Sequence, residues 1–144
     1  MNQIERNDSI NLEAPPHQVF PTLLDLEGYS RWWPKQIHFE IAAPLPPKVG
    51  TKIRISNGPL VKWTATIQEI IPNQLIRFEY SDGVWKGTAE WIIHERNSGS
   101  EVSYRISILP AQGWLKVLGK ILDLGKLHSK EMEKILKNLK KKIG

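Results

Sequence analysis

The stretch QLIRFEYSDGVWKGTAEWIIHE, residues 74–95, decides the fold. It contains two segments of alternating polarity, 74–81 and 84–95, separated by Asp82-Gly83. An Asp-Gly pair between alternating segments is a strong signal for a β-hairpin. Apolar and aromatic residues of both segments share one side: Ile76, Phe78, Tyr80, Trp85, Gly87, Ala89, Trp91 and Ile93. Because charged residues occupy the other side, the hairpin is predicted to have one apolar face and one solvated face.

Further strand candidates continue this pattern on both sides of the hairpin. Before it lie 3–13, 36–43, 50–57 and 60–71, and after it lies 100–109. From residue 36 onward the connections are short and rich in Pro, Gly and Asn. Short connections join antiparallel neighbours, so the pattern predicts an antiparallel sheet of seven strands.

Two short helical segments follow the first strand. After Ala14-Pro15-Pro16, apolar residues recur at helical spacing through Asp25, and Gly28 ends this pattern. Proline is tolerated in the first turn of a helix, so the helix is predicted to begin there. Residues 29–34 are predicted to form a short turn or a second short helix.

One long C-terminal helix is predicted over residues 112–143, where apolar residues keep a 3.6-residue period. Gly119 and Gly125 each weaken it by roughly 1 kcal/mol relative to Ala, so we expect a bend or loosened turns in its first half. This helix would be about 48 Å long and about 10 Å wide. Seven strands at about 4.8 Å spacing span more than about 30 Å. One helix covers that sheet only if the sheet curls around it, which leaves a cavity wherever side chains do not fill the space.

The composition is that of a globular protein with one domain, residues 1–144. The chain has 144 residues, of which 40% are hydrophobic and 24% charged. It contains no cysteine, which excludes disulfides, thiolate metal sites and cysteine nucleophiles. No apolar run is long enough to span a membrane, and no secretory signal is visible, so we expect a cytoplasmic protein.

The positive charge is concentrated in residues 112–144. This segment holds nine lysines against three acidic residues, for a net charge of +6, whereas residues 1–111 have a net charge of −1. A nucleic-acid-binding protein is therefore not expected. The simplest interpretation is a solvated helix face. A weak contact with an anionic membrane surface or an acidic partner is the alternative.

Five segments in this order resemble a known family. They are Ile10 to Phe20, with Ala14-Pro15-Pro16 before Val19-Phe20; Asp25 to Pro34, with Trp32-Trp33-Pro34; Val49-Gly50-Thr51; Ile71 to Phe78; and Gly99 to Tyr104. Together they resemble the polyketide cyclase/dehydrase and lipid-transport family of the START/Bet v 1-like (SRPBCC) superfamily. The resemblance implies an α+β helix-grip fold, in which a curved seven-stranded antiparallel sheet wraps a long C-terminal helix around a hydrophobic cavity.

The resemblance and the apolar face together give a set of candidate ligand-binding residues. They are Trp33, Trp63, Phe78, Tyr80, Trp85, Trp91, Tyr104, Trp114, Leu118, Leu122 and His128. His128, Tyr80, Tyr104 and the Arg6–Asp8 pair are the polar groups at inward positions. Two interpretations are open: these groups orient the polar end of a ligand, or they form hydrogen bonds and ion pairs that only support the fold. His17, His38 and His94 do not cluster with carboxylates, so no metal is expected, and no cofactor-binding motif is present.

Three functions are compatible with this pattern. The first is non-catalytic binding or transport of a hydrophobic small molecule, such as a lipid, isoprenoid or polyketide-like compound. The second is a cyclase or dehydratase acting on a polyketide-like substrate. The third is a protein-interaction module of the same superfamily. Because few inward groups could transfer protons, binding is favoured over catalysis. The protein is expected to be a monomer or a dimer.

Overall fold

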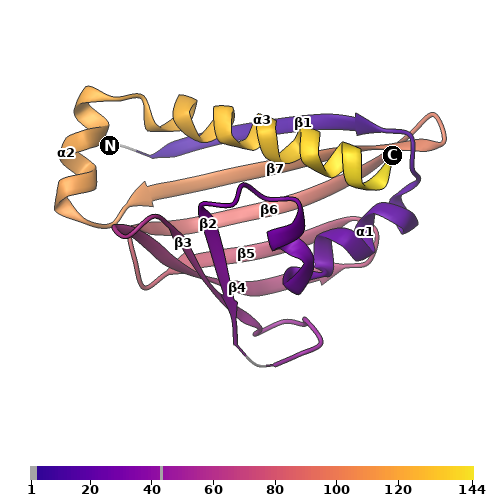
Figure 1. Cartoon of the computed structure of the whole chain (residues 1–144), viewed down its shortest axis with the longest axis horizontal. Helices are drawn as coiled ribbons and strands as arrows, with labels where there is room; N and C mark the ends of the chain where they lie inside the picture. Colours follow the sequence, from indigo (N-terminus) through magenta and orange to yellow (C-terminus); the bar gives the residue numbers. More distant parts are fainter. Residues whose placement is uncertain (1–2, 43) are drawn as a thin grey trace.

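The computed structural model describes residues 3–42 and 44–144, and it shows a curved sheet with helices on its concave side (Figure 1). The elements follow one another as β1 (Ile4–Leu12), α1 (Pro16–Leu24), the 3-10 helix η1 (Leu26–Arg31), β2 (Ile37–Ile41), β3 (Lys52–Asn57), β4 (Val61–Ile71), β5 (Leu75–Ser81), β6 (Trp85–Arg96), β7 (Gly99–Pro110), α2 (Gly113–Ile121) and α3 (Leu124–Ile143). The predicted helix-grip fold is confirmed. Residue 43, at the end of the predicted strand 36–43, lies outside the described residues.

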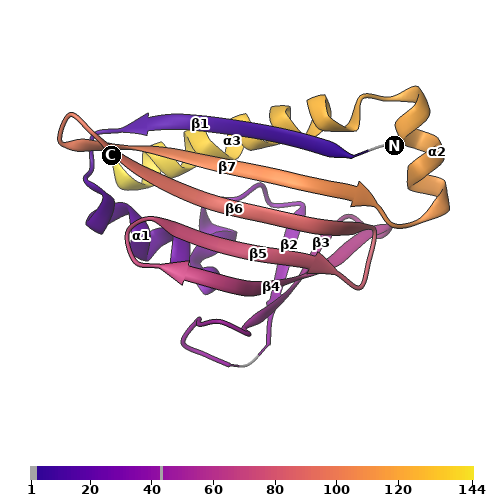
Figure 2. The ribbon, with the colours of Figure 1, turned by 180° about the vertical axis from the view of Figure 1, so that it is seen from behind.

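The seven strands form one antiparallel sheet in the order β1-β7-β6-β5-β4-β3-β2 (Figure 2). From β2 to β7 each strand pairs with the next in sequence, and β1 completes the sheet beside β7. In the predicted hairpin, Phe78 lies opposite Ala89 and Tyr80 opposite Gly87. The register shifts in β4 between Ile67 and Glu69, which adds one residue there and increases the local twist.

The predicted faces are confirmed by burial. Ile76, Phe78, Tyr80, Ala89, Trp91 and Ile93 are buried on the concave face, together with Val102, Tyr104, Ile106 and Ile108 of β7. On the convex face Arg77 forms ion pairs with Glu69 and Glu90, and Arg105 lies 3.4 Å from Glu90. The arginines of these pairs remain accessible to solvent, so each pair contributes little to stability.

The prediction of one helix over 112–143 is wrong, because the chain breaks between α2 and α3. Leu122 is extended (φ −112°, ψ 145°), and the Asp123 side chain accepts a hydrogen bond from the Lys126 backbone N–H at 3.0 Å. Aspartate at such a position is a preferred start for a new helix. The apolar stripe continues through the break, which is why periodicity alone did not reveal it.

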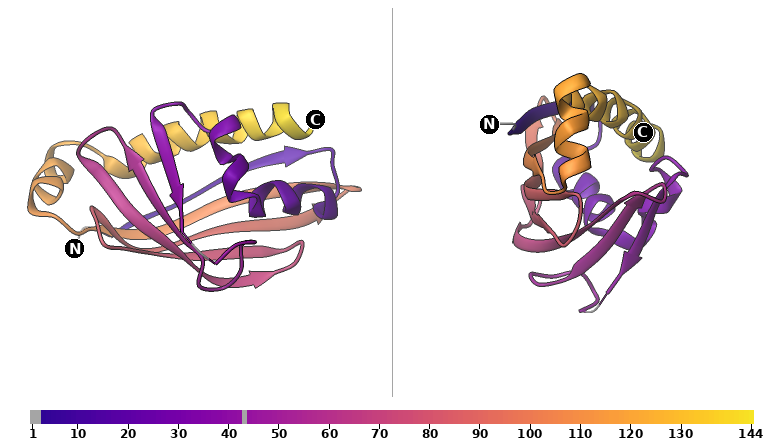
Figure 3. Two further views of the ribbon diagram at one scale, coloured as in Figure 1. Left: turned by 60° about the horizontal axis from the view of Figure 1, so that its bottom comes forward. Right: turned by 90° about the vertical axis from the view of Figure 1, so that its left-hand side faces the viewer.

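Gly125 fixes α3 to the sheet and does not loosen the helix. It is buried, and a Cβ at this position would lie 3.2 Å from Arg6 Cδ and 3.3 Å from Ile4 Cγ2. The glycine therefore allows α3 to approach β1 closely. Further along, α3 buries Met132, Ile135, Leu136 and Leu139 in the core. End-on, the sheet curls beneath α3, and α2 stands at one end of it (Figure 3).

Candidate functional site

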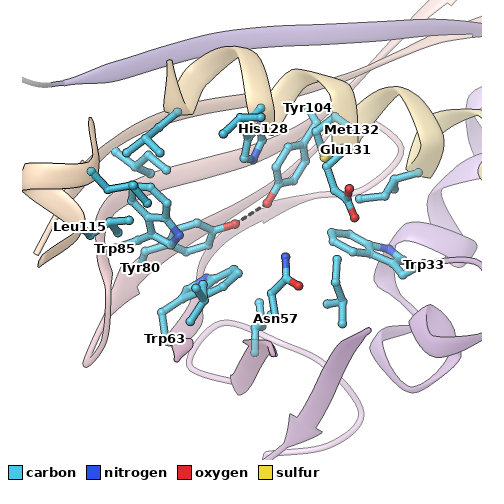
Figure 4. Close-up of a pocket in the computed structure, with 18 of the residues that line it drawn as sticks. Trp33, Asn57, Trp63, Tyr80, Trp85, Tyr104, Leu115, His128, Glu131 and Met132 are labelled. Atoms are coloured by element: carbon cyan, nitrogen blue, oxygen red, sulfur yellow. Dashed lines mark hydrogen bonds between the residues drawn. The ribbon is translucent and has the colours of Figure 1, made fainter. Parts of the chain in front are cut away.

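A cavity of about 390 Å³ lies between the concave face of the sheet, α2 and α3 (Figure 4). Its lining is mostly apolar and aromatic. The lining residues are Trp33, Ile37, Ile55, Asn57, Val61, Trp63, Tyr80, Trp85, Tyr104, Ile108, Trp114, Leu115, Leu118, Leu124, Leu127, His128, Glu131, Met132 and Ile135. A volume of this size with a few polar groups is typical of a small-molecule site.

Eight of the eleven predicted ligand-binding residues line this cavity: Trp33, Trp63, Tyr80, Trp85, Tyr104, Trp114, Leu118 and His128. Phe78 and Trp91 share the concave face but belong to the packed core, where they border a space of only about 10 Å³. The Trp91 indole N–H donates to the Tyr29 hydroxyl at 3.1 Å. Leu122 lies in the break between α2 and α3 and is not part of the lining.

Two tyrosine hydroxyls meet at the centre of the cavity wall. The oxygens of Tyr80 and Tyr104 lie 2.5 Å apart, and either one can be the donor (Figure 4). Burial raises the pKa of Tyr80 to about 12, although its hydrogen bond with Tyr104 opposes the shift. Burial also raises the pKa of Tyr104 well above its usual value. Both phenols are therefore protonated at neutral pH, and one O–H hydrogen remains free for a ligand after the two share one bond.

The Trp63 indole stands beside this pair. Its ring centroid is 5.6 Å from that of Tyr80. The indole N–H is near enough to lower the pKa of the Tyr80 phenol, but its geometry falls outside that of a hydrogen bond. Trp33 Nε1 is likewise buried without a partner among the described residues. Donors of this kind usually find a partner when buried, so two lining indoles remain available to an acceptor.

His128 lies on α3 above the tyrosine pair and stacks against Tyr104, with 6.1 Å between ring centroids and 13° between ring planes. Its Nδ1 is buried and has no hydrogen-bond partner in the described part of the chain. The pKa of His128 is lowered to about 4, chiefly by burial; nearby Asp8 opposes this shift, and Arg6 contributes to it. The imidazole is therefore neutral at pH 7. The tyrosine hydroxyls bond to each other, and Arg6 and Asp8 bond to Ser129, so none of these four residues is a hydrogen-bond partner of His128.

Arg6 and Asp8 serve a structural link outside the cavity lining. The Arg6 Nε–H donates to the Ser129 hydroxyl at 2.9 Å, and this hydroxyl donates to Asp8 Oδ2 at 3.0 Å. Ser129 is buried on α3, so the relay ties β1 to α3. Both side chains turn toward α3, and neither lines the cavity.

Two polar lining residues were not predicted, Asn57 and Glu131. Glu131 follows His128 by three residues on α3, so helical spacing could have indicated it. Its carboxylate accepts a hydrogen bond from Gln36 Nε2 at 2.9 Å. Asn57 ends β3 and is the first residue of the Asn57-Gly58-Pro59 turn. It was interpreted only as a turn residue, so its place in the cavity lining was not predicted.

The described residues contain no group of three or more His, Asp or Glu side chains that could hold a metal ion. Among these same residues, no helix is both long and apolar enough to cross a bilayer.

The family described as polyketide cyclase/dehydrase and lipid transport matches residues 3–144. The chain belongs to this family. The family description covers both enzymes and lipid carriers, so membership supports a ligand-binding or cyclase-type protein without choosing between them. Among curated proteins, none is similar enough to count as a match.

Solved structures show the same fold as this member of the polyketide cyclase/dehydrase and lipid-transport family. TTHA0849 from Thermus thermophilus is 22% identical with a TM-score of 0.79, and the match covers 96% of each chain. The Aha1 dimer from Colwellia psychrerythraea is 16% identical with a TM-score of 0.69, over 97% of this chain and 96% of that one. The di-domain ARO/CYC StfQ from the steffimycin biosynthetic pathway is 11% identical with a TM-score of 0.75, over 96% of this chain and 49% of that one.

Proposed function

We propose that this protein binds and carries a hydrophobic small molecule in the cavity between the sheet, α2 and α3. The observation that carries the proposal is the cavity of about 390 Å³ with an aromatic and aliphatic lining. Burying an apolar ligand there releases water from both surfaces, at roughly 25 cal/mol per Å² of apolar area. A lipid, isoprenoid or polyketide-like compound has the required chemistry.

The polar groups of the lining indicate that the ligand also carries a carbonyl or hydroxyl. One tyrosine O–H hydrogen, the Trp63 indole N–H and His128 Nδ1 all lack a partner among the described residues. A buried polar group without a hydrogen bond costs about 1–3 kcal/mol. A ligand oxygen near Tyr80, Tyr104 and His128 would remove part of this cost and fix the orientation of the ligand.

The protonation states favour binding over catalysis. A general base is most effective when its pKa is near the working pH. The pKa of His128 is lowered to about 4, and those of Tyr80 and Tyr104 are raised. At pH 7 these groups donate and accept hydrogen bonds but are poorly matched to proton transfer.

Cyclisation or dehydration of a polyketide-like substrate is the second candidate. It is favoured by the tyrosine O–H donors and His128, which face the same cavity and could polarise a ketone and remove a proton. StfQ, one half of which shares this fold, is an ARO/CYC protein. If the protein is an enzyme, Tyr104→Phe should abolish turnover of a poly-β-ketone while the substrate still binds.

The proposal places the protein in the cytoplasm as a monomer or a dimer. The lysines of residues 112–144 provide weak attraction to anionic membranes, where hydrophobic ligands are stored.

Mass spectrometry under native conditions tests the proposal. The protein, purified without detergent, should carry one small organic molecule per chain, which solvent extraction then identifies. Leu118→Trp fills the cavity from α2 and should remove the adduct. Lys137→Trp adds the same side chain at an exposed position of α3 outside the lining and should retain it. Equal adducts on both variants would mean that the molecule binds elsewhere.

A further inference from the structure

Three of the five large apolar residues of helix α2 are exposed. Of its residues only Leu115 is buried, whereas Val117 is 58% and Ile121 77% exposed. Trp114 on the same helix is also exposed, and so is Leu122, directly after it. We call these four exposed residues, Trp114, Val117, Ile121 and Leu122, the α2 patch. Contiguous apolar surface of this kind marks an interaction site more often than an isolated exposed leucine does.

The α2 patch lies where the cavity reaches the surface. Trp114 of α2 and Leu127 of α3 both line the cavity and are both exposed, so the cavity opens between these helices. Leu60, which is 73% exposed, sits in the turn between β3 and β4. That turn lies at the same end of the sheet as α2, because Asn57 and Val61 on either side of it line the cavity too.

The charges around the patch are positive. Residues 112–130 contain four lysines, at 116, 120, 126 and 130, and one acidic residue, Asp123. The Asp123 carboxylate is engaged as the cap of α3. On α2, Lys116 and Lys120 are four residues apart and so share one flank of the helix, next to Val117.

We propose that α2 docks on an anionic lipid bilayer, with the α2 patch inserted among the headgroups and the lysines facing lipid phosphates. A short amphipathic helix with apolar residues on one face and lysines on its flank is the chemistry that such a surface recognises. Docking places the opening of the cavity against the membrane, so a ligand can pass between bilayer and cavity without crossing water. This last step rests on the proposed function; the docking itself does not.

Sedimentation of the full chain with vesicles tests the docking. Binding to vesicles of phosphatidylglycerol and phosphatidylcholine should exceed binding to pure phosphatidylcholine, and raised salt should reduce the difference. The double variant Val117→Asn/Ile121→Asn should bind at least about tenfold more weakly, because it removes the inserted side chains. Leu45→Asn/Val49→Asn changes two exposed apolar residues of the loop between β2 and β3, outside the patch, and should bind like the wild type.

Lysine variants separate α2 from the rest of the C-terminal segment. Lys116→Gln/Lys120→Gln should weaken vesicle binding more than Lys137→Gln/Lys140→Gln on α3. Equal effects of the two pairs, or wild-type binding by Val117→Asn/Ile121→Asn, would overturn the proposal. So would self-association through the patch without vesicle binding, seen by analytical ultracentrifugation. Binding of an apolar fluorescent probe in solution, without vesicles, should persist in Val117→Asn/Ile121→Asn; its absence in the wild type would count against the proposed cavity ligand and not against docking.

Discussion

His128 should make the protein lose stability as the pH falls from 6.5 to 4. Its pKa is lowered from 6.5 to about 4 in the folded protein, chiefly by burial. The unfolded chain therefore takes up the proton first as the pH falls, so the stabilisation is complete above the unfolded pKa and is lost toward the folded pKa. Over the whole window this amounts to about 3 kcal/mol, and between pH 7 and pH 5 to about 2 kcal/mol.

Urea unfolding at pH 7 and pH 5, followed by tryptophan emission, measures this effect. His128→Gln keeps a polar side chain in the cavity but does not titrate, so its free energy of unfolding should fall by about 2 kcal/mol less than that of the wild type. His94→Gln is the matched control, because His94 is exposed on β6, and it should behave like the wild type. If the wild type and His128→Gln lose the same stability, His128 is not the buried neutral group described above.

Four further variants test the tyrosine pair, the backbone of β6 and the start of α3. Tyr104→Phe should lower the free energy of unfolding by about 1–3 kcal/mol, because it leaves the Tyr80 hydroxyl without its partner. The double variant Tyr80→Phe/Tyr104→Phe should recover part of this loss; if urea unfolding shows that the losses of the two single variants add, the hydrogen bond between the tyrosines is contradicted. Gly87→Ala should destabilise by more than about 3 kcal/mol, because the φ of +129° is strained for alanine and its Cβ would overlap the Ser107 carbonyl; an equally stable variant would contradict this backbone conformation of Gly87. Asp123→Ala should cost about 0.5–2 kcal/mol and increase amide exchange at the start of α3, whereas unchanged exchange would argue against the cap.

The sequence predicted the sheet because its information is local. Alternation of polarity and the Asp82-Gly83 turn specify both the hairpin and its faces, and burial follows them strand by strand. A bend or loosened turns were predicted in this part of the C-terminal segment, but the complete break before α3 was not, although a signal for it existed. Asp123 can cap a helix, but the helical spacing from Leu118 through Leu122 to Gly125 continues across it.

The cavity was predicted only in part, because periodicity gives the face of a residue and not its depth. Trp85 and Trp91 lie on the same face of β6, yet Trp85 lines the cavity and Trp91 is packed against Trp32, with 6.1 Å between ring centroids. Which end of the strand stays open depends on where α1, η1 and α3 lie, and tertiary packing decides that. Asn57 joins the lining for the same reason, through the path of the β3–β4 turn.

Titration with N-phenylnaphthylamine, a neutral apolar fluorescent probe, tests most directly whether the cavity receives a hydrophobic ligand. The wild type should bind one probe per chain, with quenching of tryptophan emission, because Trp33, Trp63, Trp85 and Trp114 line the cavity. Leu118→Trp should weaken binding by at least about tenfold, equivalent to about 1.4 kcal/mol, while Lys137→Trp should not change it. Absence of saturable binding to the wild type, or equal binding by Leu118→Trp, would contradict a ligand site between the sheet and the C-terminal helices.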